Sequence, residues 1–146
     1  MKRRFGVLGL LLLAACNAPP AVDAKDPVSV AQGFVEAFNA KDLSRMLPLV
    51  DQVNLDAIKA ALRDGQGSES WNAIFNPRMV LLLQQEAGKV EGPRYSGREA
   101  LVKVGAADGD VYAIGLEKQK SGDWVIVEHA ILGEAEYEAL SDKPRK

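Results

Sequence analysis

Apolar residues follow two different periods along this chain. Between Asp26 and Ala87 they recur every three to four positions, which is the spacing of one face of an amphipathic helix. Between Glu99 and Leu132 they alternate with polar residues, as in a strand with one buried face. Helices followed by an antiparallel meander predict an α+β fold in which the helices cover one face of the sheet.

Capping residues divide the helical half into separate helices. Asp26 precedes Pro27, a combination typical of a helix start, and Asp42 and Asn54 can cap two further helices. Pro48 lacks a backbone N–H, so we expect it to kink or shorten the second helix.

A continuously apolar run at residues 79–83 fits a buried helix and a buried strand equally well by its period. Asn76 and Pro77 before the run repeat the capping signal, and Gly88 after it is a typical stop. These flanks favour a helix over residues 78–87, which gives three to four N-terminal helices in all.

Three strands are predicted in the second half, at residues 99–104, 110–118 and 124–132. Turn residues separate them, at 106–109 and at 120–123. The antiparallel sheet therefore has at least three strands, and the charged residues 134–140 are compatible with a short helix.

The first fifteen residues have the layout of a secretory signal peptide. Lys2, Arg3 and Arg4 precede an apolar run that ends at Ala15. This run is shorter than the roughly 20 residues that a helix needs to cross a bilayer, so a cleaved signal fits better than a transmembrane helix.

The end of the run carries a more specific pattern. Leu13-Ala14-Ala15-Cys16 resembles the lipobox of bacterial lipoproteins. The resemblance implies cleavage before Cys16 and attachment of a diacylglyceryl group to its thiol, so that the acylated cysteine anchors the protein to a membrane. Asn17, in place of an aspartate, implies the periplasmic face of the outer membrane. The alternative is an ordinary cleaved signal in which the cysteine falls by chance.

Composition then sets the domain organisation. We expect a signal peptide at residues 1–15, a lipidated tether at 16–25, a single α+β domain at 26–140 and a charged tail at 141–146. The tether contains two prolines and several alanines and has almost nothing to bury.

Charge narrows the list of partners. The formal net charge is −2, and residues 1–15 hold three basic residues and no acidic one, so the remainder carries −5. An acidic domain without a basic run lacks the electrostatic footprint of a nucleic-acid binder. It also gives no reason to expect a polybasic contact with anionic lipid.

Two stretches carry a wider resemblance. Residues 27–38, followed by Lys41-Asp42-Leu43, look like the opening helices of nuclear-transport-factor-like cone domains, and residues 122–127 resemble their last strands. That superfamily includes ketosteroid isomerase-like and scytalone dehydratase-like enzymes as well as binding modules. The resemblance therefore implies a cone-like fold but no single activity.

A narrower resemblance links residues 49–55, residues 76–83 and the strand that begins at Trp124 to an uncharacterised family of small bacterial envelope proteins. These motifs are structural and bring no catalytic residue with them.

Candidate chemistry is sparse. His129 is the only histidine, and neighbouring Glu128 should point to the opposite face of a strand, so an acid–base pair would need another partner. The alternative is a polar residue on a partly exposed strand. Trp71, Tyr112 and Trp124 could line a small-molecule pocket or simply pack in the core. With one histidine and the only cysteine acylated, we predict no metal site and no cofactor.

These observations predict a lipid-anchored cell-envelope protein that acts in the periplasm as a non-enzymatic binding or interaction module. Its partner would be an envelope protein or a small apolar ligand. The alternative is a cone-fold enzyme of isomerase, dehydratase or hydrolase type that acts on an apolar small molecule. An enclosed cavity that holds His129 or an aspartate would favour the enzyme.

Overall fold

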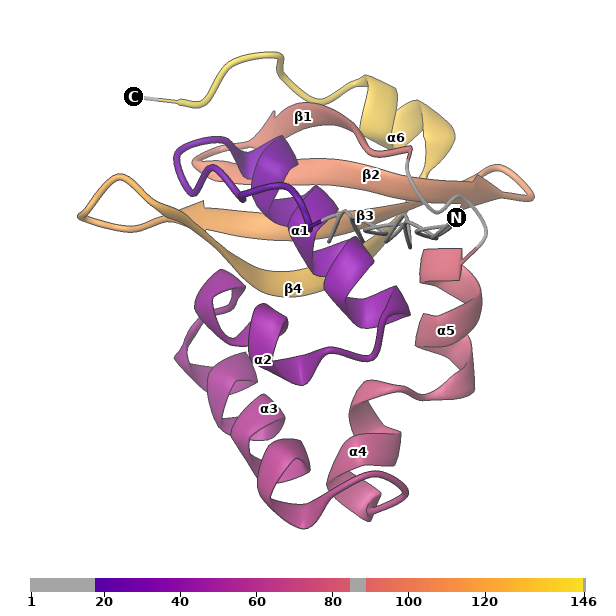
Figure 1. Ribbon diagram of the computed structural model, residues 1–146. Coiled ribbons are helices and arrows are strands. Elements are labelled where there is room, and N and C mark those ends of the chain that lie inside the picture. The colour runs from indigo at the N-terminus through magenta and orange to yellow at the C-terminus, as the bar shows by residue number, and fades with distance from the viewer. Residues whose placement is uncertain (1–17, 85–88, 146) are drawn as a thin grey trace, which may run out of the picture.

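A four-stranded antiparallel sheet with strand order β1-β2-β3-β4 lies at the centre of the computed structural model, which describes residues 18–84 and 89–145. Within those residues, helices precede the sheet and one short helix follows it (Figure 1). The α+β architecture and the helices-first order agree with the sequence prediction. The elements are α1 (Pro27–Asn39), α2 (Leu43–Met46), the 3-10 turn η1 (Leu47–Leu49), α3 (Gln52–Asp64), α4 (Glu69–Ile74), α5 (Pro77–Gln84), β1 (Glu91–Ser96), β2 (Glu99–Ala107), β3 (Asp110–Lys118), β4 (Trp124–Gly133) and α6 (Glu134–Glu138).

Side-chain caps fix where the helices begin. Asp26 accepts a hydrogen bond from the backbone N–H of Val28 at 3.0 Å, and Asp42 accepts one from Arg45 at 3.2 Å, both at predicted helix starts. The third helix begins earlier than expected, because its cap is Asp51, which accepts from the backbone N–H of Asn54 at 3.0 Å. Asn54 lies inside that helix.

The described residues before the sheet form five α-helices rather than three to four. Two of them are short, since α2 has four residues and α4 has six. Pro48 lies where α2 gives way to the 3-10 turn η1, so the second helix is shortened as expected.

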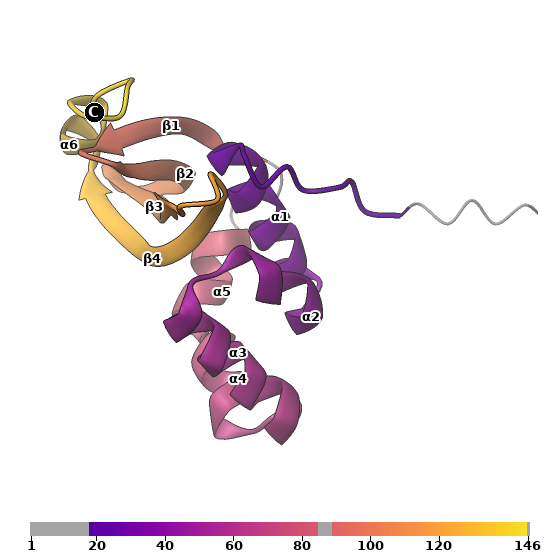
Figure 2. The same cartoon turned by 90° about the vertical axis from the view of Figure 1, so that its left-hand side faces the viewer.

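The main core lies between α1 and one face of the sheet (Figures 1 and 2). Helix α1 contributes an apolar stripe at helical spacing, and the strands contribute the alternate residues that point toward it. Each Val, Leu, Ile, Phe or Met side chain among them stabilises the fold by about 1.5–3 kcal/mol relative to exposure. Fully buried members from the two sides include Val30, Ala31, Val102, Ile114, Leu116 and Ile126.

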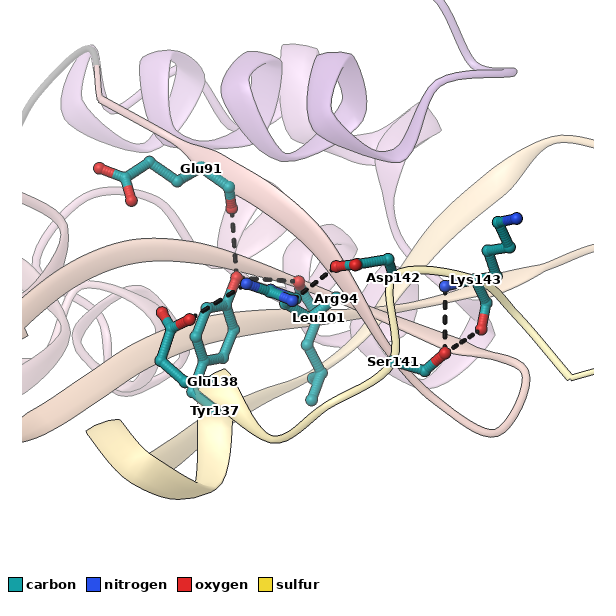
Figure 3. Close-up of polar contacts among 8 residues, drawn as sticks. All are labelled: Glu91, Arg94, Leu101, Tyr137, Glu138, Ser141, Asp142 and Lys143. Atoms are coloured by element: carbon teal, nitrogen blue, oxygen red, sulfur yellow. Dashed lines mark hydrogen bonds and ion pairs between the residues drawn. The ribbon is translucent and has the colours of Figure 1, made fainter.

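The C-terminal helix covers the opposite face of the sheet, so the expectation that all helices share one face is wrong for α6 (Figure 2). Tyr137 is only 3% exposed and packs with Leu101, Val111 and Ala113. Its hydroxyl contacts the carbonyl oxygens of Glu91 and Leu101 at 3.4 and 3.5 Å (Figure 3).

An ion-pair network holds the C-terminal segment beside α6. Arg94 on β1 contacts the carboxylates of Glu138, at 3.1 Å, and Asp142 (Figure 3). A backbone bridge between Tyr95 and Ser141 continues the contact. The tail expected from residue 141 onward is therefore packed against β1 at its start.

Strand β1 was not expected from the sequence. It forms the edge of the sheet and pairs with β2 through Tyr95–Ala100 and Ser96–Glu99. A register shift follows Glu91, at Gly92 and Pro93. These two residues are rare within strands, which is why the sequence pattern did not predict β1. An edge position tolerates proline because one side of the strand needs no partner.

Residues 22–25, which we call the strap, contact the domain although they precede α1. Val22 packs against Gly33, where any added Cβ would collide with it. The Ala24 carbonyl accepts a hydrogen bond from the backbone N–H of Trp124 at 2.8 Å. Lys25 pairs with Asp123 at 2.7 Å. The packed unit therefore reaches back to Val22.

Candidate functional site

An apolar pocket of about 330 Å³ lies where the helices meet β4. Its walls come from five helices, α1 to α5, and from strand β4, and they include Phe34, Phe38, Met46, Ile58, Met79 and Ile126. Phe34 and Phe38 are four residues apart and so share one face of α1. The volume is at the small end of the range for ligand pockets, about 300–1,000 Å³.

His129 lies at this pocket and is its only titratable lining residue among the described residues. It pairs in register with Ile114, whose side chain is buried against the helices, so the imidazole points to the helical face. Its ring centroid is 5.9 Å from that of Phe34, while much of the residue stays accessible to solvent.

The surroundings of His129 favour the neutral imidazole. Desolvation against the pocket wall lowers the pKa of His129 below its usual value, and the nearby charge of Glu128 opposes the shift only in part. A neutral imidazole offers one hydrogen-bond donor and one acceptor. His129 can therefore hold a polar group at the end of an otherwise apolar ligand.

Two amides complete the polar part of the lining, and both are engaged in local structure. Asn54 donates to Asp51 at 2.6 Å and to the Val127 carbonyl at 3.2 Å. Asn76 accepts from the Met79 N–H at 3.0 Å and donates to the Ala73 carbonyl at 3.0 Å. These amides hold α3 and α5 at the pocket.

The acid–base arrangement that would favour an enzyme is not assembled by the described residues of this pocket. No aspartate or glutamate lines it. Glu128 pairs in register with Gly115 and faces the other side of the sheet from His129. The lining is largely apolar, and its described residues offer His129 no carboxylate partner.

The other predicted pocket residues lie elsewhere. Trp71 belongs to a different pocket, where its ring centroid is 4.8 Å from that of Phe75. Trp124 packs near Tyr95 at 6.4 Å and lines a third cavity. Tyr112 is half-buried on β3. The structure therefore does not join Trp71, Tyr112 and Trp124 with His129 in one site, and Cys16 lies outside the described residues.

Sequence reasoning missed a pair of carboxyl groups on the second face of the sheet. Glu99 and Glu128 both approach Gly115, where a Cβ would collide with either side chain. Burial, followed by the charge of Glu128 and then that of Glu117, raises the pKa of Glu99 to about 7. The Glu99 Oε1 atom is buried and has no hydrogen-bond partner among the described residues.

The proximity of Glu99 and Glu128 depends on the register of β3 and β4, which the sequence pattern does not give. Gly115 pairs with Glu128 but Leu116 pairs with Ile126, so Val127 is an extra residue in β4. Strict alternation counted from Ile126 would place Glu128 on the helical face of the sheet and His129 on the opposite face. The β-bulge at Val127 reverses these two faces, so His129 lies on the helical face.

Residues 18–84 and 89–145 contain no group of three or more His, Cys, Asp or Glu side chains placed to hold a metal ion. None of their helices combines the length and the apolar character that a membrane crossing requires. No protein-family model matches the chain, and neither a curated protein nor a solved structure matches it significantly.

Proposed function

We propose that this protein is a lipid-anchored cell-envelope protein whose domain binds a small apolar ligand without transforming it. The apolar pocket beside β4 carries the proposal. It has a volume of about 330 Å³, apolar walls from five helices and one strand, and a single titratable group, His129, in its lining. A partner protein of the envelope could donate or receive the ligand.

The anchor part of the proposal rests on the sequence. Leu13-Ala14-Ala15-Cys16 resembles a lipobox and follows a basic start and a short apolar run. A lipid on Cys16, with Asn17 after it, would hold the domain at the periplasmic face of the outer membrane. Two or more acyl chains anchor a protein durably, whereas one chain binds reversibly.

We also propose that the domain is a member of the cone-like, nuclear-transport-factor-like group. Two features support this. Helix α1 crosses one face of a curved antiparallel sheet (Figure 2). The apolar pocket is lined by residues of the helices and of that face. The fold itself is common to enzymes and binding modules, so the pocket chemistry carries the function.

The lining defines the ligand. An apolar body would contact Phe34, Phe38 and Ile58, and one polar end would lie near His129. Binding of such a body is favoured by about 25 cal/mol for each Å² of apolar surface that leaves water. A highly charged ligand would lose its hydration there without gaining a partner.

The experiment uses the dye 1-anilinonaphthalene-8-sulfonate as the apolar probe. The full-length protein is titrated in a fixed concentration of detergent, whose own dye signal is the same for every variant. Ala57→Leu and Ala73→Leu each add a larger side chain to the pocket wall from a solvent-exposed helix position. We expect each variant to bind the dye about tenfold more weakly, which corresponds to about 1.4 kcal/mol.

The matched control is Lys59→Leu. Lys59 is exposed on α3, two residues from Ala57, and does not line the pocket. This variant adds the same apolar side chain to the same helix and should bind the dye as the parent does. Unchanged dye binding in both alanine variants, with circular dichroism showing them folded, would refute the proposed ligand site.

A further inference from the structure

A second pocket, of about 310 Å³, lies on the other side of Phe38 from the apolar pocket. The two pockets share only Phe38 among their described lining residues. The end of α1, the 65–68 loop, α4 and α5 form its walls. We call it the amide pocket, after a lining that combines aromatic rings, side-chain amides and one cation: Asn39, Lys41, Gln66, Trp71, Asn72 and Phe75.

A fixed aromatic surface forms one wall. The Trp71 ring is tilted against Phe75 with centroids 4.8 Å apart, and Phe75 is held in turn against Phe38 at 4.9 Å. Trp71 stays partly exposed, whereas Phe38 is 3% exposed. A rigid and accessible ring of this kind binds flat apolar faces of a ligand at little entropic cost.

The side-chain amides of the lining leave hydrogen-bonding groups for a ligand. Asn72 donates to the Gly67 carbonyl at 3.3 Å, and Gln66 is exposed beside it. Asn39 donates through Nδ2 to the Leu83 carbonyl at 3.4 Å, and its Oδ1 is covered by the protein, so Asn39 holds the wall in place. The exposed amides of Asn72 and Gln66 can accept hydrogen bonds from hydroxyl groups and donate to them.

Lys41 supplies the only charge of the lining. It is exposed and forms no ion pair with a described residue, and its backbone has a φ of 53°. An ammonium group at the rim can pair with one anionic group of a ligand. The chain as a whole is acidic, with a net charge of −2, which disfavours a polyanion but not a single carboxylate.

We propose that the amide pocket binds an acidic sugar. One apolar face of the sugar ring would lie on Trp71, its hydroxyl groups would pair with Asn72 and Gln66, and its carboxylate would pair with Lys41. A purely apolar ligand would bury these amides without partners, and a neutral sugar would leave Lys41 unused. The site is separate from the apolar pocket and does not depend on the function proposed for that pocket.

The test titrates the full-length protein with glucuronic acid and, separately, with glucose. A detergent without a sugar headgroup keeps the medium free of competing ligand. In Trp124→Phe, Trp71 is the sole tryptophan of the chain, so its emission reports on the pocket. We expect a saturable change in the millimolar range and a preference of about tenfold for glucuronic acid. Saturation-transfer NMR on the unaltered chain gives an independent measurement.

Three further variants assign the contacts. Lys41→Gln should abolish the preference for glucuronic acid and leave glucose binding intact, and Asn72→Ala should weaken both sugars. Lys120→Gln, which alters an exposed lysine of the turn before β4, should change neither. The proposal is overturned if neither fluorescence nor NMR detects sugar binding, or if Lys41→Gln keeps the full preference for glucuronic acid.

Discussion

Glu99 and Glu128 bring two carboxyl groups together over Gly115, and this contact couples folding to pH. The folded pKa of Glu99, about 7, lies above the ordinary value of 4.5 because of burial and then the charges of Glu128 and Glu117. The cavity that Glu99 lines also contains three basic residues, Arg98, Lys118 and Arg145. Their charges do not cancel the rise in the pKa of Glu99. Protonated Glu99 is thus favoured in the folded state.

The sign of the pH effect follows from this raised pKa. The stabilisation is complete below about pH 4.5 and is lost as the pH rises through about 7. Allowing for solvent screening, we expect the free energy of unfolding contributed by this group to fall by about 1 kcal/mol. Urea denaturation of the parent and of Glu99→Gln across this range measures it, and the variant should lose that part of the dependence.

A matched substitution makes the assignment specific. Glu136 is exposed on α6, and Glu136→Gln removes the same charge from a different place. It should keep the pH dependence of the parent. A pH profile of Glu99→Gln that superimposes on the parent profile would contradict the role of the carboxyl pair.

At the scale of elements, α6 is attached to the sheet by the ring of Tyr137 more than by its hydroxyl. Tyr137 is buried among Leu101, Val111 and Ala113, whereas its hydroxyl contacts are long, at 3.4 and 3.5 Å. We expect Tyr137→Ala to lower the free energy of unfolding by about 3 kcal/mol. Tyr137→Phe should lower it by less than about 1 kcal/mol.

Chemical denaturation of both variants separates the two contributions. Equal losses in Tyr137→Ala and Tyr137→Phe would show that hydrogen bonding, and not packing, holds the helix. An additional measurement, amide hydrogen exchange in β2 and β3, should show faster exchange in Tyr137→Ala because α6 no longer covers that face.

Local signals explain which elements could be predicted from the sequence. Asp26 and Asp42 act within a few residues of themselves, and their caps are where the sequence places them. Strand β1 contains Gly92 and Pro93, which normally argue against a strand, and only its edge position and pairing with β2 permit them. The side covered by α6 depends on Tyr137 meeting residues of β2 and β3, which the sequence pattern does not encode.

The site was harder to predict because it depends on register. One extra residue at Val127 reverses the faces of Glu128 and His129 relative to simple alternation. The sequence identified His129 as the one candidate base but could not place it beside Phe34. Trp71 and Trp124 likewise have the composition of pocket residues, yet the fold assigns them to separate cavities.

At the scale of the whole molecule, the strap sets how far the domain can move from its proposed anchor. Residues 22–25 are held on α1 and at the turn before β4 by Val22, the Ala24 carbonyl and Lys25. Five residues, 17–21, therefore separate Cys16 from the packed domain. Fully extended, the six residue steps from Cys16 to Val22 span about 20 Å, so an acylated Cys16 would keep the domain close to the bilayer surface.

The anchor is tested by expressing the full-length protein in a bacterium with two membranes. Mass spectrometry of the mature N-terminus should show Cys16 carrying acyl chains. Cys16→Ala should move the protein from the membrane fraction to the supernatant, because a short apolar segment without a lipid is too weak to hold it. The strap begins at Val22, so the variant should keep the parent's circular dichroism and dye binding.

A second variant tests the membrane. Asn17→Asp introduces the aspartate that usually retains bacterial lipoproteins in the inner membrane, and it should shift the acylated protein there on a density gradient. Asn17→Gln should stay with the parent. An unmodified mature N-terminus at another residue would contradict the lipobox assignment. If Cys16→Ala stays in the membrane fraction at the parent's level, the domain itself binds the membrane. The short segment before the strap would then no longer set the distance between the domain and the bilayer.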